Sequence, residues 1–281
     1  MSWDRERIVS LLLRAGEVAR ECRADLRREL KRDRTIVTRA DREIEALFRR
    51  EFERPESGTY VIGEETVEAR SEAYLEAALR EECYVVDPID GTIPYAYGLP
   101  FWGISIGRME ASVLTDGAVY LPEMGDLFAS EGDRIQRSIA TSGTWERTWL
   151  ERPRSEPDPL GLLAITQGVA KRGKVLLPNP VLVLGVAVVP MVGLLHGQFL
   201  AYLGSVKLWD VAGALPLLLR QGFSATVRAG DAIVRVTARV DETAYHLRPE
   251  SPTRWKLRSD LLICHAGDEA RLRAAFVYGR D

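Results

Sequence analysis

The sequence predicts a mixed α/β protein, and three patterns support that fold class. Apolar residues recur at helical spacing between residues 3 and 30. Short runs rich in β-branched and aromatic residues follow one another between residues 101 and 130, as in an antiparallel meander. Beyond residue 160, strand-like runs alternate with helical ones, which favours a layered α/β arrangement.

The first half of the chain combines helices with this meander. We expect helices over residues 3–30, from Thr38 onwards, and roughly over 67–80. The strands that we expect cover residues 59–62, 84–86, 101–108, 112–120 and 126–130. Turns at Met109-Glu110 and Pro122-Glu123 would connect the last three of these strands.

The second half is predicted to begin after a segment rich in Pro, Glu, Arg and Ser, residues 141–160. We therefore expect two lobes, residues 1–145 with most candidate ligands and residues 146–281 with the substrate pocket. Strands are expected at 162–166, 199–203, 224–227 and 261–264, and helices at 185–195, 209–220 and 269–276.

Composition excludes several classes of protein. The 281 residues include 38 basic and 41 acidic side chains, a net charge of −3, so charge gives no support to a nucleic-acid partner. The most apolar stretch, residues 181–195, is too short and too broken by Gly and Pro to span a membrane. The charged N-terminus lacks the apolar core of a signal peptide, so we expect a cytoplasmic protein.

The cysteines and histidines indicate a reducing compartment and no zinc site. Cys22, Cys83 and Cys264 are far apart and form no CxxC motif, so we expect reduced thiols. The chain has only three histidines, so we do not expect a His/Cys zinc centre.

The most informative stretch runs from Tyr84 to Thr92. A short apolar strand leads into Asp87 and Asp90, with Pro88 between them and Gly91 after them. Such a turn can direct both carboxylates and the carbonyl of Ile89 into one small volume, as Mg²⁺ requires. Taken alone, the same residues also fit an ordinary turn between two strands.

Other acidic residues also follow a strand or open a helix, where ligands gather in layered α/β proteins. Individually, each also fits a structural role as a solvated turn residue or a first-turn helix acid. The complete set of candidates is Asp41, Glu64, Glu65, Asp87, Asp90 and Asp210.

Together these strings resemble the inositol monophosphatase family. The similarity rests on Gly-Glu-Glu at 63–65, Asp-Pro-Ile-Asp-Gly-Thr at 87–92 and Trp-Asp at 209–210. Thr-Arg-Ala-Asp at 38–41 resembles the first-helix motif of that family. The resemblance extends over most of the chain, with a looser match in the last sixty or so residues.

The resemblance implies a layered α-β-α-β-α sandwich and a Mg²⁺-dependent phosphomonoesterase with two or three ions. It assigns one ion to Glu64, Asp87 and the Ile89 carbonyl. It assigns a second ion to Asp87, Asp90 and Asp210. A third ion, bound more weakly, would lie beside Glu64. Clustered carboxylates suit this chemistry because metal ions neutralise a phosphate and lower the pKa of water.

The resemblance also implies roles for the neighbouring residues. Thr92 and Glu64 would orient the attacking water, and Asp41 would hold the Thr92 hydroxyl. Asp210 would act near the leaving oxygen, and no phosphoenzyme is expected. The residues implied in substrate binding are Asp90, Gly91, Thr92, Gly185, Ala187 and Asp210.

Several positions depart from the family pattern. Ile93-Pro94-Tyr95 follows Thr92, and Leu203 replaces a glutamate that binds sugar hydroxyls in inositol-specific members. Gln221-Gly222-Phe223-Ser224 stands where a Gly-Gly pair is usual. We therefore expect retained metal chemistry with an altered specificity pocket, in which Lys207 could meet an anionic group.

Three other functions remain open. The substrate could be histidinol phosphate, or 3′-phosphoadenosine 5′-phosphate, for which Lys171, Arg172 and Lys207 are the candidate contacts. The chain could also be a catalytically silent module that binds metal or phosphate. Family members are commonly homodimers, so we expect a homodimer that acts on a small phosphorylated substrate.

Overall fold

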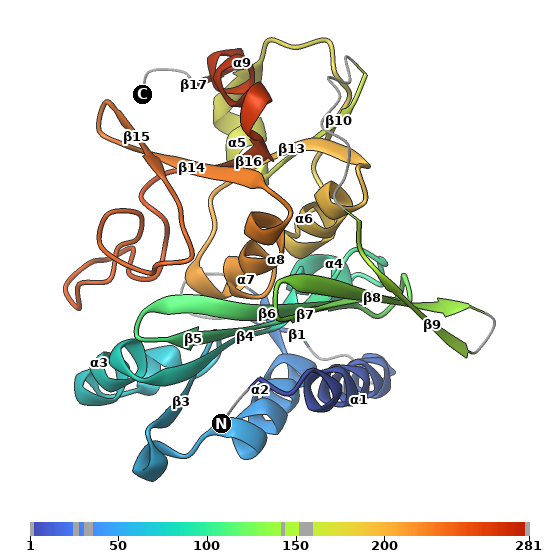
Figure 1. Ribbon diagram of the computed structural model, residues 1–281, viewed down its shortest axis with the longest axis vertical. Coiled ribbons are helices and arrows are strands. Elements are labelled where there is room, and N and C mark those ends of the chain that lie inside the picture. Colours follow the sequence, from blue (N-terminus) through green and yellow to red (C-terminus); the bar gives the residue numbers. More distant parts are fainter. Residues whose placement is uncertain (1–2, 25–27, 31–35, 142–143, 152–159, 279–281) are drawn as a thin grey trace.

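The protein is built from five alternating layers of helices and sheets (Figure 1). The computed structural model describes residues 3–24, 28–30, 36–141, 144–151 and 160–278. The layers confirm the α-β-α-β-α sandwich that the resemblance implied. Within the described residues, no helix is long and apolar enough to cross a membrane.

Helices α1 and α2 form the first layer. α1 (Arg5–Arg23) begins at Asp4, whose carboxylate accepts the Arg7 amide, and α2 (Arg39–Phe52) begins after Thr38, as predicted. The expected extension of α1 to residue 30 is wrong. Residues Arg28–Leu30 form strand β1, which pairs with β2 (Ile36–Thr38), so that ladder hydrogen bonds replace helical ones.

The second layer is a sheet in which β3–β9 pair in chain order. β3 and β4 are parallel and all later pairs are antiparallel, as the meander predicted. Residues 144–149, inside the predicted boundary segment, are an edge strand instead. The strands are β3 (Thr59–Gly63), β4 (Glu82–Asp90), β5 (Gly103–Glu110), β6 (Val113–Leu121), β7 (Asp126–Glu131), β8 (Arg134–Thr141) and β9 (Thr144–Trp149).

The third layer contains α6 (Val188–Leu195), α7 (Leu208–Ala212) and α8 (Leu215–Arg220). The single helix expected over residues 209–220 is therefore divided in two. Pro216 lies at the start of α8 and has no amide hydrogen to donate to the preceding turn, so the first helix cannot continue through it.

The fourth layer is a mixed sheet. Three strands are parallel in the order β12-β10-β13, and β16, β14 and β15 continue antiparallel. The strands are β10 (Leu162–Ile165), β12 (Val181–Leu182), β13 (Phe199–Gly204), β14 (Phe223–Ala229), β15 (Ala232–Arg235) and β16 (Leu261–His265).

Helices α5 (Gln167–Arg172) and α9 (Glu269–Ala275) form the outer layer. Two further helices flank the first sheet, α3 (Glu72–Arg80) and α4 (Thr92–Ala96). A short pair, β11 (Gly173–Val175) and β17 (Phe276–Tyr278), lies beside α5 and α9. Single 3₁₀ turns occupy Pro55–Ser57, Val67–Ala69 and Ala266–Asp268.

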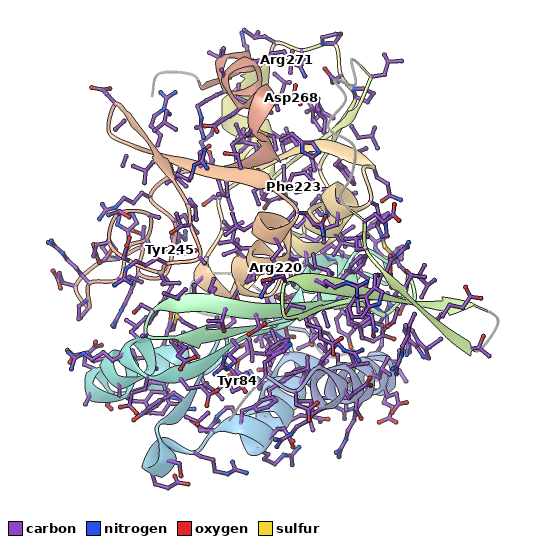
Figure 2. The ribbon with its side chains drawn as sticks, viewed as in Figure 1. Tyr84, Arg220, Phe223, Tyr245, Asp268 and Arg271 are labelled. Atoms are coloured by element: carbon purple, nitrogen blue, oxygen red, sulfur yellow. The ribbon has the colours of Figure 1, made fainter. Side chains whose placement is uncertain are left out.

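Apolar side chains fill the space between successive layers. One core separates α1 and α2 from the first sheet, and there Phe52 stacks on Tyr84 with 4.0 Å between ring centroids (Figure 2). A second core fills the space between the two sheets around α6–α8. A third lies between the second sheet and the outer helices, where Arg271 and Asp268 form an ion pair at 2.9 Å.

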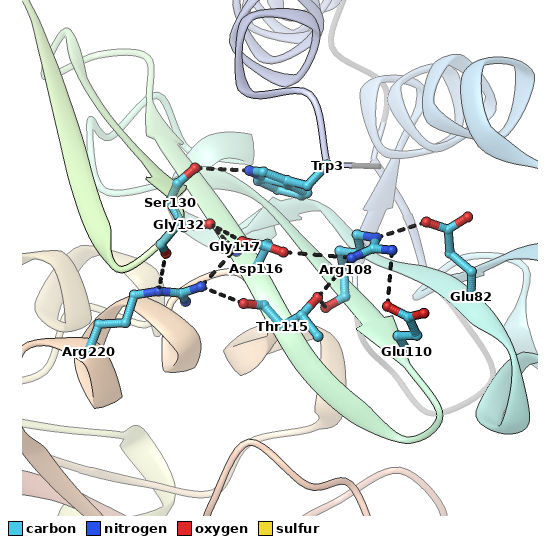
Figure 3. Close-up of polar contacts among 10 residues, drawn as sticks. All are labelled: Trp3, Glu82, Arg108, Glu110, Thr115, Asp116, Gly117, Ser130, Gly132 and Arg220. Atoms are coloured by element: carbon cyan, nitrogen blue, oxygen red, sulfur yellow. Dashed lines mark hydrogen bonds and ion pairs between the residues drawn. The ribbon is translucent and has the colours of Figure 1, made fainter. Parts of the chain in front are cut away.

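A polar chain ties the third layer to the first sheet (Figure 3). The Arg220 guanidinium donates to the carbonyls of Gly132 and Thr115, at 3.0 and 2.6 Å, and lies 3.2 Å from Asp116. Asp116 accepts the Ser130 hydroxyl at 3.0 Å, and the Ser130 carbonyl accepts the Trp3 indole at 2.9 Å. The position of α8 over the sheet is therefore fixed by hydrogen bonds as well as by packing.

Glycines allow α7 to approach the first sheet closely. A methyl group at Gly107 would lie 2.3 Å from the Ala212 carbonyl oxygen, and one at Gly117 would lie 2.1 Å from that of Gly213. Both neighbours are backbone atoms, which cannot rotate away. This contact holds α7 against β5 and β6, beside the end of β4.

We predict that Gly117→Ala lowers the melting temperature by several degrees, because the added methyl group forces α7 away from the sheet. A loss of stability of about 1–3 kcal/mol is expected for such overpacking. Gly267→Ala is the matched control, since a methyl group there meets no atom within 4 Å. Equal melting temperatures for the two variants in thermal denaturation would contradict this account of the layer contact.

Candidate active site

Glu64 and Asp87 are brought together by parallel strands. Gly63 is paired with Val86 in the β3–β4 ladder, and the Glu64 amide donates to the Val86 carbonyl at 3.3 Å. Each acid is the residue next to that last pair, so both lie at the carboxyl ends of neighbouring strands. Ligand sites are typical of this position in layered α/β folds.

A bulge in β4 turns Asp87 and Asp90 to the same side. Asp87 is opposite Ser105 and Asp90 is opposite Gly103, so three steps along β4 match two along β5. In a regular strand, residues three apart point to opposite faces, and one extra residue corrects this. The bulge contains Pro88, which has no amide hydrogen to contribute to the ladder.

The α7 helix supplies Asp210. Its Oδ2 atom accepts the Lys207 amide at 2.8 Å, which closes the first turn of the helix. The carboxyl groups of Asp87 and Asp210 lie close enough to share a hydrogen bond. The structure thus brings Glu64, Asp87, Asp90 and Asp210 within electrostatic reach of one another.

Burial and repulsion by neighbouring acids raise the pKa values of Asp87, Asp90 and Asp210. For Asp87, burial raises the pKa most, followed by the charges of Glu64, Asp90 and Asp210. Burial and the Asp210 charge raise the pKa of Asp90. Burial and then the Glu64 charge raise the pKa of Asp210 to about 7. The charged forms therefore destabilise the fold unless a cation neutralises them.

One atom of this cluster lacks a protein partner. The Asp87 Oδ1 atom is buried and forms no hydrogen bond with any residue that the structure describes. Buried carboxylate oxygens normally have partners, so this atom marks a place for a ligand. Carboxylates and a backbone carbonyl are the hard oxygen donors that Mg²⁺ prefers, and these residues therefore fit the metal that the resemblance implied.

The carboxylates are not arranged as a completed metal shell. Among the described residues, no three Asp, Glu, His or Cys side chains are gathered at the spacing of a formed metal site. Asp90 Oδ2 instead accepts the amides of Ala187, at 2.8 Å, and Val188. The charges of Glu64, Asp90 and Asp210 nevertheless act on Asp87, and a bound cation can take the place of such hydrogen bonds without a change of fold.

The expected hydrogen bond between Thr92 and Asp41 is present. The Thr92 hydroxyl lies 3.3 Å from Asp41 Oδ1 and 3.1 Å from the Ile89 carbonyl oxygen. Asp41 is buried, and its Oδ2 accepts the Thr38 amide at 2.8 Å and the Thr38 hydroxyl at 2.6 Å. Gly91 adopts a φ of 87° just before α4, a conformation that suits glycine.

The segment predicted to contact substrate also reaches this region. Gly185, with a φ of 73°, would place a methyl group 3.7 Å from Pro94 of α4. The Ala187 amide is bound to Asp90, so it stabilises that carboxylate. Lys207 Nζ lies 3.9 Å from Glu64 Oε1 and 4.9 Å from the Trp209 ring centroid, between the acids and the surface.

Two residues near the carboxylate cluster were not identified from the sequence. Glu45 on α2 is buried and accepts the Glu65 amide at 2.7 Å and the Thr66 hydroxyl, so it holds the turn that carries Glu64. Its four-residue spacing from Asp41 on one helix face was the available signal. The Tyr202 hydroxyl is buried and has no hydrogen-bond partner in the described part of the chain, and burial and the charges of Asp90 and Asp210 raise its pKa.

Comparisons with known proteins agree with this geometry. The model of the inositol monophosphatase family matches residues 5–251. An inositol monophosphatase of Mesembryanthemum crystallinum is 35% identical over 116 residues, covering 41% of this chain and 42% of that protein. A histidinol-phosphatase of Chlorobaculum parvum is 29% identical over 133 residues, covering 47% and 49%. The chain spans less than half the length of these two relatives.

Longer but weaker matches are found as well. Inositol monophosphatase 2 of Mus musculus is 25% identical over 252 residues, 85% of each chain. The solved structure of an IMPase/NADP phosphatase complexed with Mg²⁺ and phosphate has a TM-score of 0.70 at 16% identity and covers 98% of this chain and 97% of its own. An IMPase of Thermotoga maritima has a TM-score of 0.68 at 16% identity, with coverage of 96% and 95%. These structures share the fold.

We predict that Asp210→Asn stabilises the metal-free protein at pH 8. The pKa of Asp210 is raised by folding to about 7, so the metal-free fold loses stability as the pH rises from about 4 through 7. Asparagine avoids that charge and still accepts the Lys207 amide. In EDTA, the variant should melt higher than wild type at pH 8, and this difference should shrink progressively as the pH falls from 7 towards 4. A lower melting temperature at pH 8 would contradict the repulsion.

Proposed function

This chain belongs to the inositol monophosphatase family, and we propose that it hydrolyses a small phosphomonoester in a Mg²⁺-dependent reaction. The observation that carries the proposal is the cluster of Glu64, Asp87, Asp90 and Asp210, in which one buried Asp87 oxygen has no partner among the described residues. Such a set is costly to fold around unless a divalent cation offsets its charge.

Five residues would hold the metal. Glu64, Asp87 and the Ile89 carbonyl would form one site, and Asp87, Asp90 and Asp210 a second, for two or three ions in total. When bound, Mg²⁺ neutralises the phosphate oxygens and lowers the pKa of water. Asp87 belongs to both sites, which agrees with its burial and its interaction with the other three acids.

Thr92 and Glu64 would orient the attacking water. The Thr92 hydroxyl can donate to only one acceptor at a time, and Asp41 and Ile89 both lie within reach. When its proton points to Asp41, its oxygen is free to accept a hydrogen from water. Direct attack by water needs no nucleophilic side chain, so we propose no phosphoenzyme.

The pocket is better suited to a substrate other than inositol phosphate. Leu203, expected in place of a sugar-binding glutamate, packs instead in the core between the second sheet and the outer helices, so that position offers no acceptor to sugar hydroxyls. Lys207 lies close to Glu64 and can meet an anionic group. Histidinol-phosphatases are among the relatives, including one of Mycobacterium tuberculosis that is 35% identical over 100 residues. Histidinol phosphate is therefore the second candidate substrate.

We also propose a cytoplasmic homodimer of two-lobed subunits, divided near residue 145. The described cysteines Cys22, Cys83 and Cys264 are buried and unpaired, which agrees with a reducing compartment. Sedimentation equilibrium of the purified protein tests the dimer.

We predict that Asp90→Asn lowers Mg²⁺-dependent turnover by about 100-fold or more, because it removes a charge from the second metal site. The fold should persist, since asparagine can accept the Ala187 amide. Asp133→Asn, an exposed residue in the β7–β8 turn, is the matched control and should retain wild-type turnover. Full activity of Asp90→Asn would show that Asp90 is not a metal ligand and would contradict the proposed site.

Phosphate release from a substrate panel tests the function itself. We expect Mg²⁺-dependent release, abolished by EDTA, from at least one of inositol 1-phosphate, fructose 1,6-bisphosphate, histidinol phosphate and 3′-phosphoadenosine 5′-phosphate. If a folded protein that binds Mg²⁺ released no phosphate from any of the four substrates, that result would favour a non-catalytic binding role.

A further inference from the structure

We propose that a cavity on the outer face of the second sheet binds a small anion with an apolar body, at a site separate from the carboxylate cluster. The cavity has a volume of about 430 Å³, in the range of small-molecule sites. Its lining includes none of the predicted metal ligands. The residues that carry the argument are Arg172, Leu203, Arg228, Lys256, Leu262 and Phe276.

The two sites lie on opposite faces of the same sheet. Leu203, Leu262 and Phe276 line the cavity and belong to the outer core, between the second sheet and helices α5 and α9. Tyr202 belongs to the core between the sheets, where burial and the nearby charges of Asp90 and Asp210 raise the pKa of its hydroxyl. Because successive side chains of a strand point to opposite faces, β13 separates the cavity from the acids.

Three cations converge on the cavity from separate elements. Arg172 comes from α5, Arg228 from β14 and Lys256 from the segment that precedes β16. None of the three forms an ion pair with a residue in the described ranges of the chain. Unpaired cations around a concave, partly apolar surface attract anions.

The other charged residues that line the cavity do not cancel the positive charge of these three cations. Arg258 is paired with Glu242 at 3.0 Å, and Arg273 Nε lies 3.8 Å from Glu269. Among the described residues, Asp260 is the single acid that lines the cavity. The side chains facing the cavity therefore carry more positive than negative charge after these pairs are counted.

Hydrogen bonds hold the backbone at two of these cationic residues. The Arg228 amide donates to the Ser259 hydroxyl at 2.7 Å, and the Lys256 carbonyl accepts the His246 amide at 2.8 Å. The buried Tyr245, labelled in Figure 2, pairs with Leu257 in the same segment. A preorganised backbone reduces the entropy lost when a ligand binds.

The lining defines the chemistry of the ligand. Guanidinium and ammonium groups recognise phosphate and related anions through charge-assisted hydrogen bonds. The leucines and Phe276 suit an apolar or aromatic body, and the His246 ring also faces the cavity. The ligand class is thus a small molecule in which a phosphate-like group is attached to an apolar body.

Calorimetric titration with phenylphosphonate in EDTA tests the site. The carbon–phosphorus bond of this probe is not a phosphoester, and without divalent cations the carboxylate cluster repels anions. We expect saturable binding at one site per chain, tighter than that of inorganic phosphate. This readout is independent of phosphatase activity. Absence of saturable binding to the folded protein would overturn the proposal.

Matched variants locate the binding. Arg228→Gln and Lys256→Gln should each weaken phenylphosphonate binding by about tenfold or more, because each removes one charged donor. Lys256→Arg should preserve binding. Arg235→Gln, on the exposed edge strand β15 and outside the cavity, is the control for net charge. The same loss in Arg235→Gln as in Arg228→Gln would indicate non-specific attraction and contradict the site.

Discussion

The burial and crowding of carboxylates is the constraint on which the rest of this structure depends. Burial first, and then the charges of neighbouring acids, raise the pKa values of Asp87, Asp90 and Asp210. A fold that gathers such groups loses stability to do so, and a divalent cation removes that loss. Metal binding and folding stability are therefore linked in this protein, and the linkage becomes stronger as the pH rises.

Backbone geometry, rather than side-chain packing, assembles this cluster. Parallel pairing of β3 and β4 aligns Glu64 with Asp87, and the bulge turns Asp90 to the same side. Glycines at 107 and 117 admit α7 with Asp210. These features belong to two adjacent layers, so the site forms where the first sheet meets the helices of the third layer. The outer cavity, by contrast, lies one sheet further away.

The sequence was most informative where chemistry depends on short strings. The acids at 64, 87, 90 and 210 follow strands or open helices, and local patterns predicted both features. Pairings set by distant residues were not predictable in this way. Residues 28–30 continue a helical pattern but pair with 36–38. The role of Glu45 follows from its hydrogen bond to the Glu65 amide, a contact between distant residues. The outer cavity is lined by residues between 172 and 276 that have no regular spacing in the sequence.

The central claim is that these carboxylates hold protons until a cation replaces them. Calorimetric titration of Mg²⁺ at pH 7 in buffers of different ionisation enthalpy measures the protons released on binding. We predict release of a fraction of a proton or more per chain, because the pKa of Asp210 is about 7 and those of Asp87 and Asp90 are also raised. Mg²⁺ binding that releases no protons, and that Asp87→Asn leaves unchanged, would contradict the account.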